Sequence, residues 1–294
     1  MDMNTKGNND VVSTSFSGGE LKEKAQALQD LKNYYKGSDS YKSHLVAKSA
    51  SFFQKYVSAV CSVTTANDKI LDLGCGVGQS TQEISKYREH VVGVDLSSRF
   101  LRRSDEESYN TKMFAAADAA HLPFANGAFN MVCSMEFIEH VWPVEAVLRE
   151  MIRVTGKSGN IIVASPSLLS PLRPVFDFPG MLLKGIFRPP HYSDFSSAGK
   201  YFVESLNQSA RKYFRRTPQF LYQKPDVTRA DDGGDFDAVY RSHSTDLRRF
   251  FQSEGLSVRF ASSPLAWSRG WLEMHMAAML APVWTSFIVI ATKN

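Results

Sequence analysis

Three glycines at alternate positions, followed by an acidic residue at the end of the next apolar run, are the part of this sequence whose spacing could do chemistry. Gly74, Gly76 and Gly78 follow one apolar run, and Asp95 ends another. Glycine has no Cβ, so backbone N–H groups in such a turn can approach a ligand closely. An acidic side chain at the end of the second strand can accept hydrogen bonds from both hydroxyls of a ribose. The pattern predicts a nucleotide-binding site.

The spacing also disfavours one class of nucleotide. A dinucleotide fingerprint has the form Gly-x-Gly-x-x-Gly, in which the third glycine lets the helix and strand pack closely. Here Gln79 and Ser80 follow Gly78, so that third glycine is absent. Binding of a pyrophosphate is therefore not expected.

These residues resemble the first two motifs of class I S-adenosylmethionine-dependent methyltransferases, and later segments resemble motifs of their small-molecule branch, called methyltransferase type 11. The resemblance covers roughly 45–164, with a weaker similarity in 244–294. The segments that carry it, in chain order, are 70–78 (ILDLGCGVG), 91–95 (VVGVD), 117–119 (ADA), 122–124 (LPF) and 128–132 (AFNMV). The resemblance implies an S-adenosylmethionine-dependent methyltransferase.

The resemblance also implies which residues bind the cofactor. Asp118 would accept the adenine amino group, the Ala119 backbone would help to read the ring, and the transferable methyl would point toward Met135. The full set implied for the cofactor is Asp72, Gly74, Cys75, Gly76, Gly78, Asp95, Leu96, Asp118, Ala119 and Met135.

Two glutamates and a histidine follow the fourth strand expected at 129–135. Glu136, Glu139 and His140 resemble the Glu-x-x-Glu-His segment of ubiquinone-pathway O-methyltransferases, some of which use a divalent metal there. Carboxylates and an imidazole can hold such an ion, but metal-free relatives share the segment, so the question stays open and no metal is assigned. An imidazole titrates near neutral pH and can remove a proton from a hydroxyl. His140 is the candidate catalytic base.

The elements that must position these residues alternate between apolar runs and helical patterns, which favours an α/β fold. We expect a Rossmann-like sheet of seven mostly parallel strands, with helices on both faces, an antiparallel last strand and a helical lid inserted after strand five. Helices are expected at 20–35, 43–61, 97–107, 143–154 and 246–254, and strands at 70–73, 91–94, 113–116, 129–135, 160–164, 256–261 and 286–292.

The expected organisation is one core interrupted by insertions. Residues 1–19 are polar and predicted to be disordered, whereas 20–164 should form the N-terminal helices and the cofactor-binding core. The long segment 165–243 is interpreted as a substrate lid, because a chain leaving strand five rises over the ligand-facing edge of such a sheet. The core resumes at 244–294, with a second lid insertion at 262–285.

The composition of both insertions favours an apolar acceptor. The first contains eight of the chain's 20 phenylalanines, and the second contains three tryptophans and three methionines. Flat aromatic and flexible Met surfaces suit an apolar or aromatic ligand. The alternative is that these side chains pack on each other as the lid's own core.

Several other residues have two interpretations. The tyrosines of the segment 34–41 could close over the cofactor or be surface aromatics between helices, and His191 and His243 could orient an acceptor hydroxyl or be structural. The acidic turn at 231–237 fits no calcium loop and is interpreted as solvated. No site is assigned to any of them.

Composition narrows the function classes. The formal net charge is only +4, which does not predict a nucleic-acid partner. Three cysteines are too few for a disulfide framework, and the sequence has no signal-peptide pattern, so the cytoplasm is the expected location. The leading hypothesis is O-methylation of an apolar small molecule. N- or C-methylation, methylation of a lipid at a membrane surface through 175–188, and cofactor binding without catalysis are the alternatives. The sequence leaves the acceptor, the methylated atom, the pathway and the oligomeric state undecided.

Overall fold

The computed structural model describes residues 26, 29–36, 38–101, 114–175, 195–232, 235–260 and 286–294. The predicted disordered N-terminus (1–19) and the second lid insertion (262–285) lie outside these residues. So do most of the apolar side chains attributed to the first lid, and so does His191.

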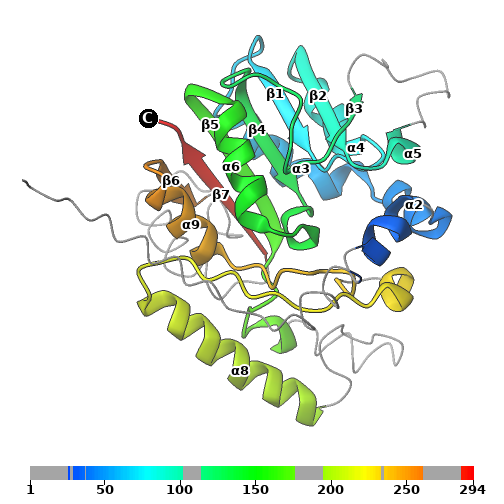
Figure 1. Cartoon of the computed structure of the whole chain (residues 1–294), viewed down its shortest axis with the longest axis vertical. Coiled ribbons are helices and arrows are strands. Elements are labelled where there is room, and N and C mark those ends of the chain that lie inside the picture. Colours follow the sequence, from blue (N-terminus) through cyan, green and yellow to red (C-terminus); the bar gives the residue numbers. More distant parts are fainter. Residues whose placement is uncertain are drawn as a thin grey trace, which may run out of the picture.

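Seven strands form one sheet in the order β3-β2-β1-β4-β5-β7-β6 (Figure 1). The first five run parallel, and β7 is antiparallel to both of its neighbours. This confirms the predicted fold class. The strands are β1 (Lys69–Leu73), β2 (His90–Asp95), β3 (Phe114–Ala116), β4 (Phe129–Met135), β5 (Thr155–Pro166), β6 (Ser257–Phe260) and β7 (Ser286–Thr292).

Helices cover both faces of the sheet because the strands present apolar side chains in both directions. On one face, Leu71 and Leu73 share a core with α6 and α9; on the other, Ile70 packs with α3 and α4. The helices are α2 (Asp39–Val46), α3 (Ala50–Ser62), α4 (Gln79–Ser85), α5 (Ser98–Leu101), α6 (Val144–Val154), α8 (Phe195–Phe214) and α9 (Ser244–Ser253), with short 3₁₀ turns η3 (Ile138–His140) and η4 (Val227–Asp232). No helix in the described ranges is long and apolar enough to cross a bilayer.

Some element boundaries differ from the predictions. The helix expected at 43–61 is two helices, α2 and α3, because the chain becomes extended at Ser49. The strand expected at 160–164 begins earlier, so that Gly156 and Gly159 both lie inside β5. A Cβ on Gly159 would lie 2.7 Å from the Asn130 carbonyl oxygen, so the close approach of strands explains that glycine. Helix α9 is capped by the His243 ring, which accepts a hydrogen bond from the Thr245 N–H, and not by Ser244 or Thr245.

Asn130 of β4 contacts the neighbouring strand β1 through its side chain. Its side-chain oxygen accepts a hydrogen bond from the Lys69 N–H at 2.9 Å, at the start of β1. These two strands are therefore joined by a side-chain bond as well as by backbone pairing.

The inserted segment is attached to the core by both side-chain and backbone contacts. Lys212 of α8 and Asp246 of α9 form a buried ion pair, with Nζ 2.5 Å from Oδ2. The N–H groups of Val239 and Tyr240 both donate to the carbonyl oxygen of Glu139, each at 2.9 Å. These backbone bonds hold the end of the insertion against η3, directly after β4.

Candidate active site

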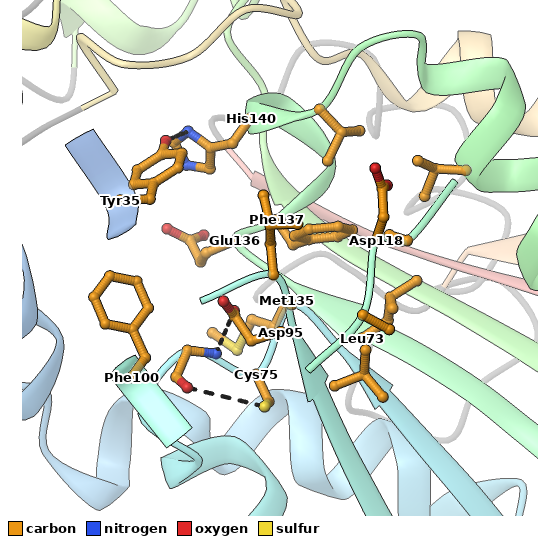
Figure 2. Close-up of a pocket in the computed structure, with 18 of the residues that line it drawn as sticks. Tyr35, Leu73, Cys75, Asp95, Phe100, Asp118, Met135, Glu136, Phe137 and His140 are labelled. Atoms are coloured by element: carbon orange, nitrogen blue, oxygen red, sulfur yellow. Dashed lines mark hydrogen bonds between the residues drawn. The ribbon is translucent and has the colours of Figure 1, made fainter. Parts of the chain in front are cut away.

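A cavity of about 460 Å³ lies where β1, β2 and β4 end, the edge at which parallel α/β sheets bind ligands (Figure 2). Its far wall comes from the N-terminal helical segments, through residues such as Leu31, Tyr35 and Phe52. Among the residues that the structure describes, none between 165 and 243 lines it. The lid role of the insertion stays a prediction, and the N-terminal segment is the described cover.

Most of the residues that the resemblance implied for cofactor binding line this cavity. Those that line it, together with the candidate base, are Gly74, Cys75, Gly76, Asp95, Leu96, Asp118, Ala119, Met135 and His140. Asp72 and Gly78 do not line it.

The glycine turn packs closely against two phenylalanine rings because it lacks side chains. Gly74 has φ +74°, and a Cβ there would lie 2.1 Å from the Phe137 ring; Gly78 has φ +85°, and its Cβ would lie 2.6 Å from the Phe114 ring. The N–H groups of Gly74 and Cys75 already donate to the Val94 carbonyl. The turn therefore offers close contact with its backbone, and not the N–H donors that the sequence suggested.

Asp95 organises this turn from the end of β2. Its Oδ2 accepts from the Gly76 N–H at 2.9 Å, and its Oδ1 accepts from the Ser97 N–H at 2.8 Å. Burial raises the pKa of this carboxyl, and the backbone N–H donors oppose that rise. Each carboxylate oxygen has a further lone pair, so two ribose hydroxyls can still bind.

Asp72 supports the turn from behind. It is buried and accepts hydrogen bonds from Tyr56 Oη at 2.8 Å, Ser80 Oγ at 2.6 Å and Thr81 Oγ1 at 2.7 Å. Burial raises its pKa, and the three donors lower it. Asp72 therefore joins β1 to α3 and α4, a supporting position that the sequence pattern did not distinguish from contact with the ligand.

Asp118 follows β3 and lines the same cavity. Its Oδ1 accepts from the Ala120 N–H at 2.9 Å, and its Oδ2 is 3.7 Å from the Lys32 Nζ. Its side chain is 45% exposed, so it can turn toward an adenine amino group.

Charged side chains gather beyond the end of β4, around Glu136, Glu139 and His140 (Figure 2). Glu136 has φ +52°, an uncommon conformation for a residue other than glycine and a sign of strain that clusters at functional sites. His140 lines the cavity, and its Nδ1 lies 3.1 Å from the Tyr35 hydroxyl and 3.4 Å from Asp237 Oδ2. Burial lowers the pKa of His140, but the surrounding carboxylates, Asp237 first, raise it further, so its net pKa is above the ordinary value.

Glu139 is fully buried beside this imidazole. Its Oε2 accepts from Ser165 Oγ at 3.0 Å, whereas Oε1 has no hydrogen-bond partner in the described part of the chain. Burial is the main cause that raises the pKa of Glu139 to about 8, with the carboxylates of Glu136 and Asp235 adding to it and His140 opposing it.

A third carboxylate joins the two glutamates. Oxygen atoms of Glu136, Glu139 and Asp235 all lie within 4.8 Å of one another, so these are the residues that could hold a divalent cation with oxygen ligands. The set differs from the one weighed from the sequence, because Asp235 takes the place of His140. Arg173 lies 3.2 Å from Asp235 and balances part of the negative charge.

Sequence reasoning missed the acidic residues that the insertion contributes. The turn at 231–237 was interpreted as solvated, but Asp237 is only 2% exposed and Asp235 is partly buried, so that interpretation is wrong for both. No local signal marks them, since long-range contacts, such as the bonds of Val239 and Tyr240 to Glu139, bring this turn to the site. Tyr35, from the segment noted as able to close over the cofactor, lines the cavity and donates its hydroxyl hydrogen bond to Asp237. His243 is buried and caps α9 away from the cavity.

The strand order, the glycine turn and the acidic residue after β2 define the class: this is a class I S-adenosylmethionine-dependent methyltransferase fold. Residues 71–163 match the family model of a methyltransferase domain, so the chain carries such a domain. Magnesium protoporphyrin IX methyltransferase from Synechocystis PCC 6803, solved with bound S-adenosylmethionine, shares the fold with a TM-score of 0.50 and 12% identity, over 96% of this chain and 100% of that one.

Three curated relatives align with about a third of the chain. Tocopherol O-methyltransferase of Arabidopsis thaliana is 32% identical over 33% of this chain and 30% of its own length. Norajmaline N-methyltransferase of Rauvolfia serpentina is 34% identical over 33% and 35%. Demethylmenaquinone methyltransferase of Corynebacterium urealyticum is 35% identical over 37% and 45%. The chain thus spans less than half the length of these relatives.

Proposed function

We propose that this protein transfers a methyl group from S-adenosylmethionine to a hydroxyl of an apolar or aromatic small molecule, in a cytoplasmic reaction. The observation that carries the proposal is that one cavity contains both the glycine turn with Asp95 and, past Met135, the imidazole of His140. The names of two relatives, which concern tocopherol and demethylmenaquinone, support an apolar ring as acceptor.

The residues fit this cofactor. The glycine turn lines the cavity next to Asp95, and Asp95 and Asp118 offer acceptors for ribose and adenine donors. When bound, S-adenosylmethionine supplies a methyl group on a sulfonium, which is already strongly electrophilic. The protein's part is to orient the acceptor, exclude water and take up its proton.

His140 is the group proposed to take that proton. Removing a positioned base typically lowers a rate by about 10²–10⁴-fold. We expect His140→Gln to lower kcat by that amount and to leave the affinity for S-adenosylmethionine unchanged. The measurement is mass gain of one methyl on a panel of hydroquinones and phenols, with calorimetry of cofactor binding in parallel.

The outcomes of this experiment separate the alternatives. Methyl transfer only to nitrogen or carbon would replace the hydroxyl acceptor with the N- or C-methyltransferase alternative. Tight cofactor binding with no turnover on any acceptor would favour a binding protein without catalysis. If calorimetry detected no heat of association with S-adenosylmethionine or its demethylated product, all three functions would be contradicted.

A second candidate concerns an acceptor taken from a membrane. The segment first considered for membrane contact, 175–188, lies outside the described residues after Val175, but helix α8 offers a different surface. One side of α8 exposes apolar side chains, and basic residues lie along the same helix and just after it. The apolar set is Phe202, Val203, Leu206, Tyr213 and Phe214, and the basic set is Lys200, Arg211, Arg215 and Arg216. This combination is typical of a helix that lies in the interface of an anionic bilayer.

Co-sedimentation with vesicles tests this surface. Wild-type protein is expected to bind vesicles that contain anionic lipid and to bind neutral vesicles more weakly. The double variant Leu206→Ser/Phe214→Ser should lose binding, whereas Asn207→Ser, an exposed change on the same helix, should retain it. Equal binding by all three proteins, or none by the wild type, would remove this candidate.

A further inference from the structure

Two residues far apart in the sequence converge on one nitrogen of His140. Tyr35, from the helical segment 29–36, brings its hydroxyl to 3.1 Å from Nδ1. Asp237, from the inserted segment, brings Oδ2 to 3.4 Å from the same atom, and the Tyr35 hydroxyl lies 2.6 Å from that oxygen. The Tyr35 ring also meets the imidazole edge-on, at 87° and a centroid distance of 6.1 Å (Figure 2).

The number of protons available fixes the direction of these bonds. An ionised carboxylate only accepts, so the single hydroxyl proton of Tyr35 is donated to Asp237. The Tyr35 oxygen then acts as acceptor toward His140, and Nδ1 must carry the proton between them. In a neutral imidazole, a proton on Nδ1 leaves the lone pair on Nε2.

Asp237 is held in this place by the backbone around it. It is 2% exposed, and Val239 and Tyr240, two and three residues further on, donate their N–H groups to the carbonyl oxygen of Glu139. Since Glu139 directly precedes His140, the carboxylate and the imidazole are attached to the same short piece of chain.

We propose that Asp237 and Tyr35 are positioning residues that hold His140 in the tautomer protonated on Nδ1, so that Nε2 is the nitrogen that receives the acceptor's proton. The role in turnover rests on the proposed function, whereas the tautomer does not. In this proposal neither residue contacts the reacting atoms. Both act through His140.

Other charged groups also face this imidazole. Glu139 Oε1 lies 3.7 Å from Nε2, and Glu136 and Asp235 contribute further negative charge. Asp237 is the strongest of the four in raising the pKa of His140, so its loss should produce the largest fall.

The first test follows His140 itself by NMR of the full chain labelled with ¹⁵N-histidine, without cofactor. His140→Gln identifies the signal among the seven histidines. The wild type is expected to show the Nδ1–H form in its neutral state. Asp237→Asn should lower the pKa and mix the tautomers, and Tyr35→Phe should mix the tautomers with a smaller change in pKa. Asp226→Asn, an exposed residue of the same segment, and Tyr34→Phe are matched controls and should leave the signal unchanged.

The second test is kinetic. Asp237→Asn should lower kcat, with KM for S-adenosylmethionine unchanged, by less than the roughly 10²–10⁴-fold expected for loss of the base itself. The acidic limb of the pH–rate profile should move to lower pH, in step with the NMR titration.

A neutral His140 protonated on Nε2 in the wild type, or a titration and tautomer that neither Asp237→Asn nor Tyr35→Phe alters, would overturn the proposal. Absence of turnover with every acceptor would instead count against the proposed function, because the NMR result decides the positioning of His140 by itself.

Discussion

The two ends of the cavity are built in different ways. At the nucleotide end, the glycine turn and Asp95 come from consecutive elements, β1 to β2, and parallel strand pairing alone brings them together. At the acceptor end, His140 is surrounded by side chains from three separate segments of the chain, represented by Tyr35, Glu139 and Asp237. Sheet topology makes the first end, and the packing of an insertion and an N-terminal helix makes the second.

Because the two ends are built from different parts of the chain, mutations should be able to affect cofactor binding and turnover separately. A change that loosens the insertion should damage the surroundings of His140 while the turn that holds the nucleotide survives. A change at Asp95 should do the reverse.

The largest expected effect is on the attachment of the insertion. Lys212→Met would leave the carboxylate of Asp246 buried without its cation, and breaking a buried pair in this way costs about 3–5 kcal/mol of folding free energy. Urea unfolding should show that loss, whereas Lys200→Met, an exposed change on the same helix, should stay within about 0.5 kcal/mol of wild type. A Lys212→Met protein as stable as the wild type would mean that α8 is not anchored through this pair.

The next effect is on the nucleotide end. Asp95→Ala removes the acceptor proposed for two ribose hydroxyls, and also the acceptor of the Gly76 N–H. Two bonds to a charged group, at roughly 1.5–3 kcal/mol each, predict a loss of affinity of about 100-fold or more for S-adenosylmethionine. Calorimetry checks this, and Asp118→Ala, which removes one proposed bond, should lose only about tenfold. Unchanged affinity in Asp95→Ala would show that the cofactor does not lie on the glycine turn.

The same contrast explains how much the sequence could predict. The strand order, the antiparallel β7 and the residues of the nucleotide end follow from local patterns, because each apolar run, glycine turn and acidic residue lies within one supersecondary unit. Asp72 belongs to the same pattern, but only its partners Tyr56, Ser80 and Thr81 show that it faces away from the cavity.

The acceptor end could not be predicted in the same way. Composition placed the cover of the site in the insertion, whereas the described wall comes from segments such as the one containing Tyr35. Asp235 and Asp237 are two acidic residues in a glycine-containing turn, a pattern typical of a solvated loop. What buries them is a pair of backbone bonds to Glu139 across about a hundred residues, and no local pattern encodes such a contact.

The sharpest probe of the acceptor end is the pH dependence contributed by Glu139. Its pKa is about 8 in the folded protein and near 4.5 when unfolded. Below about pH 4.5 both states carry the proton, so the group adds no pH dependence. Between these values the unfolded state has lost the proton and the folded state keeps it, so stability falls as pH rises, and above about pH 8 the loss is complete.

Glutamine stays neutral throughout and has nearly the shape of the protonated acid. Glu139→Gln should therefore flatten the fall in unfolding free energy between pH 5 and pH 9, whereas Glu89→Gln, at an exposed position, should follow the wild-type curve. Denaturant unfolding at a series of pH values measures this. If the variant and the wild type fell together, Glu139 would be ionised in the folded protein at neutral pH. A bound cation or a charged His140 would then have to balance it, and the acceptor end would be a compensated charge cluster instead of a neutral acid beside a base.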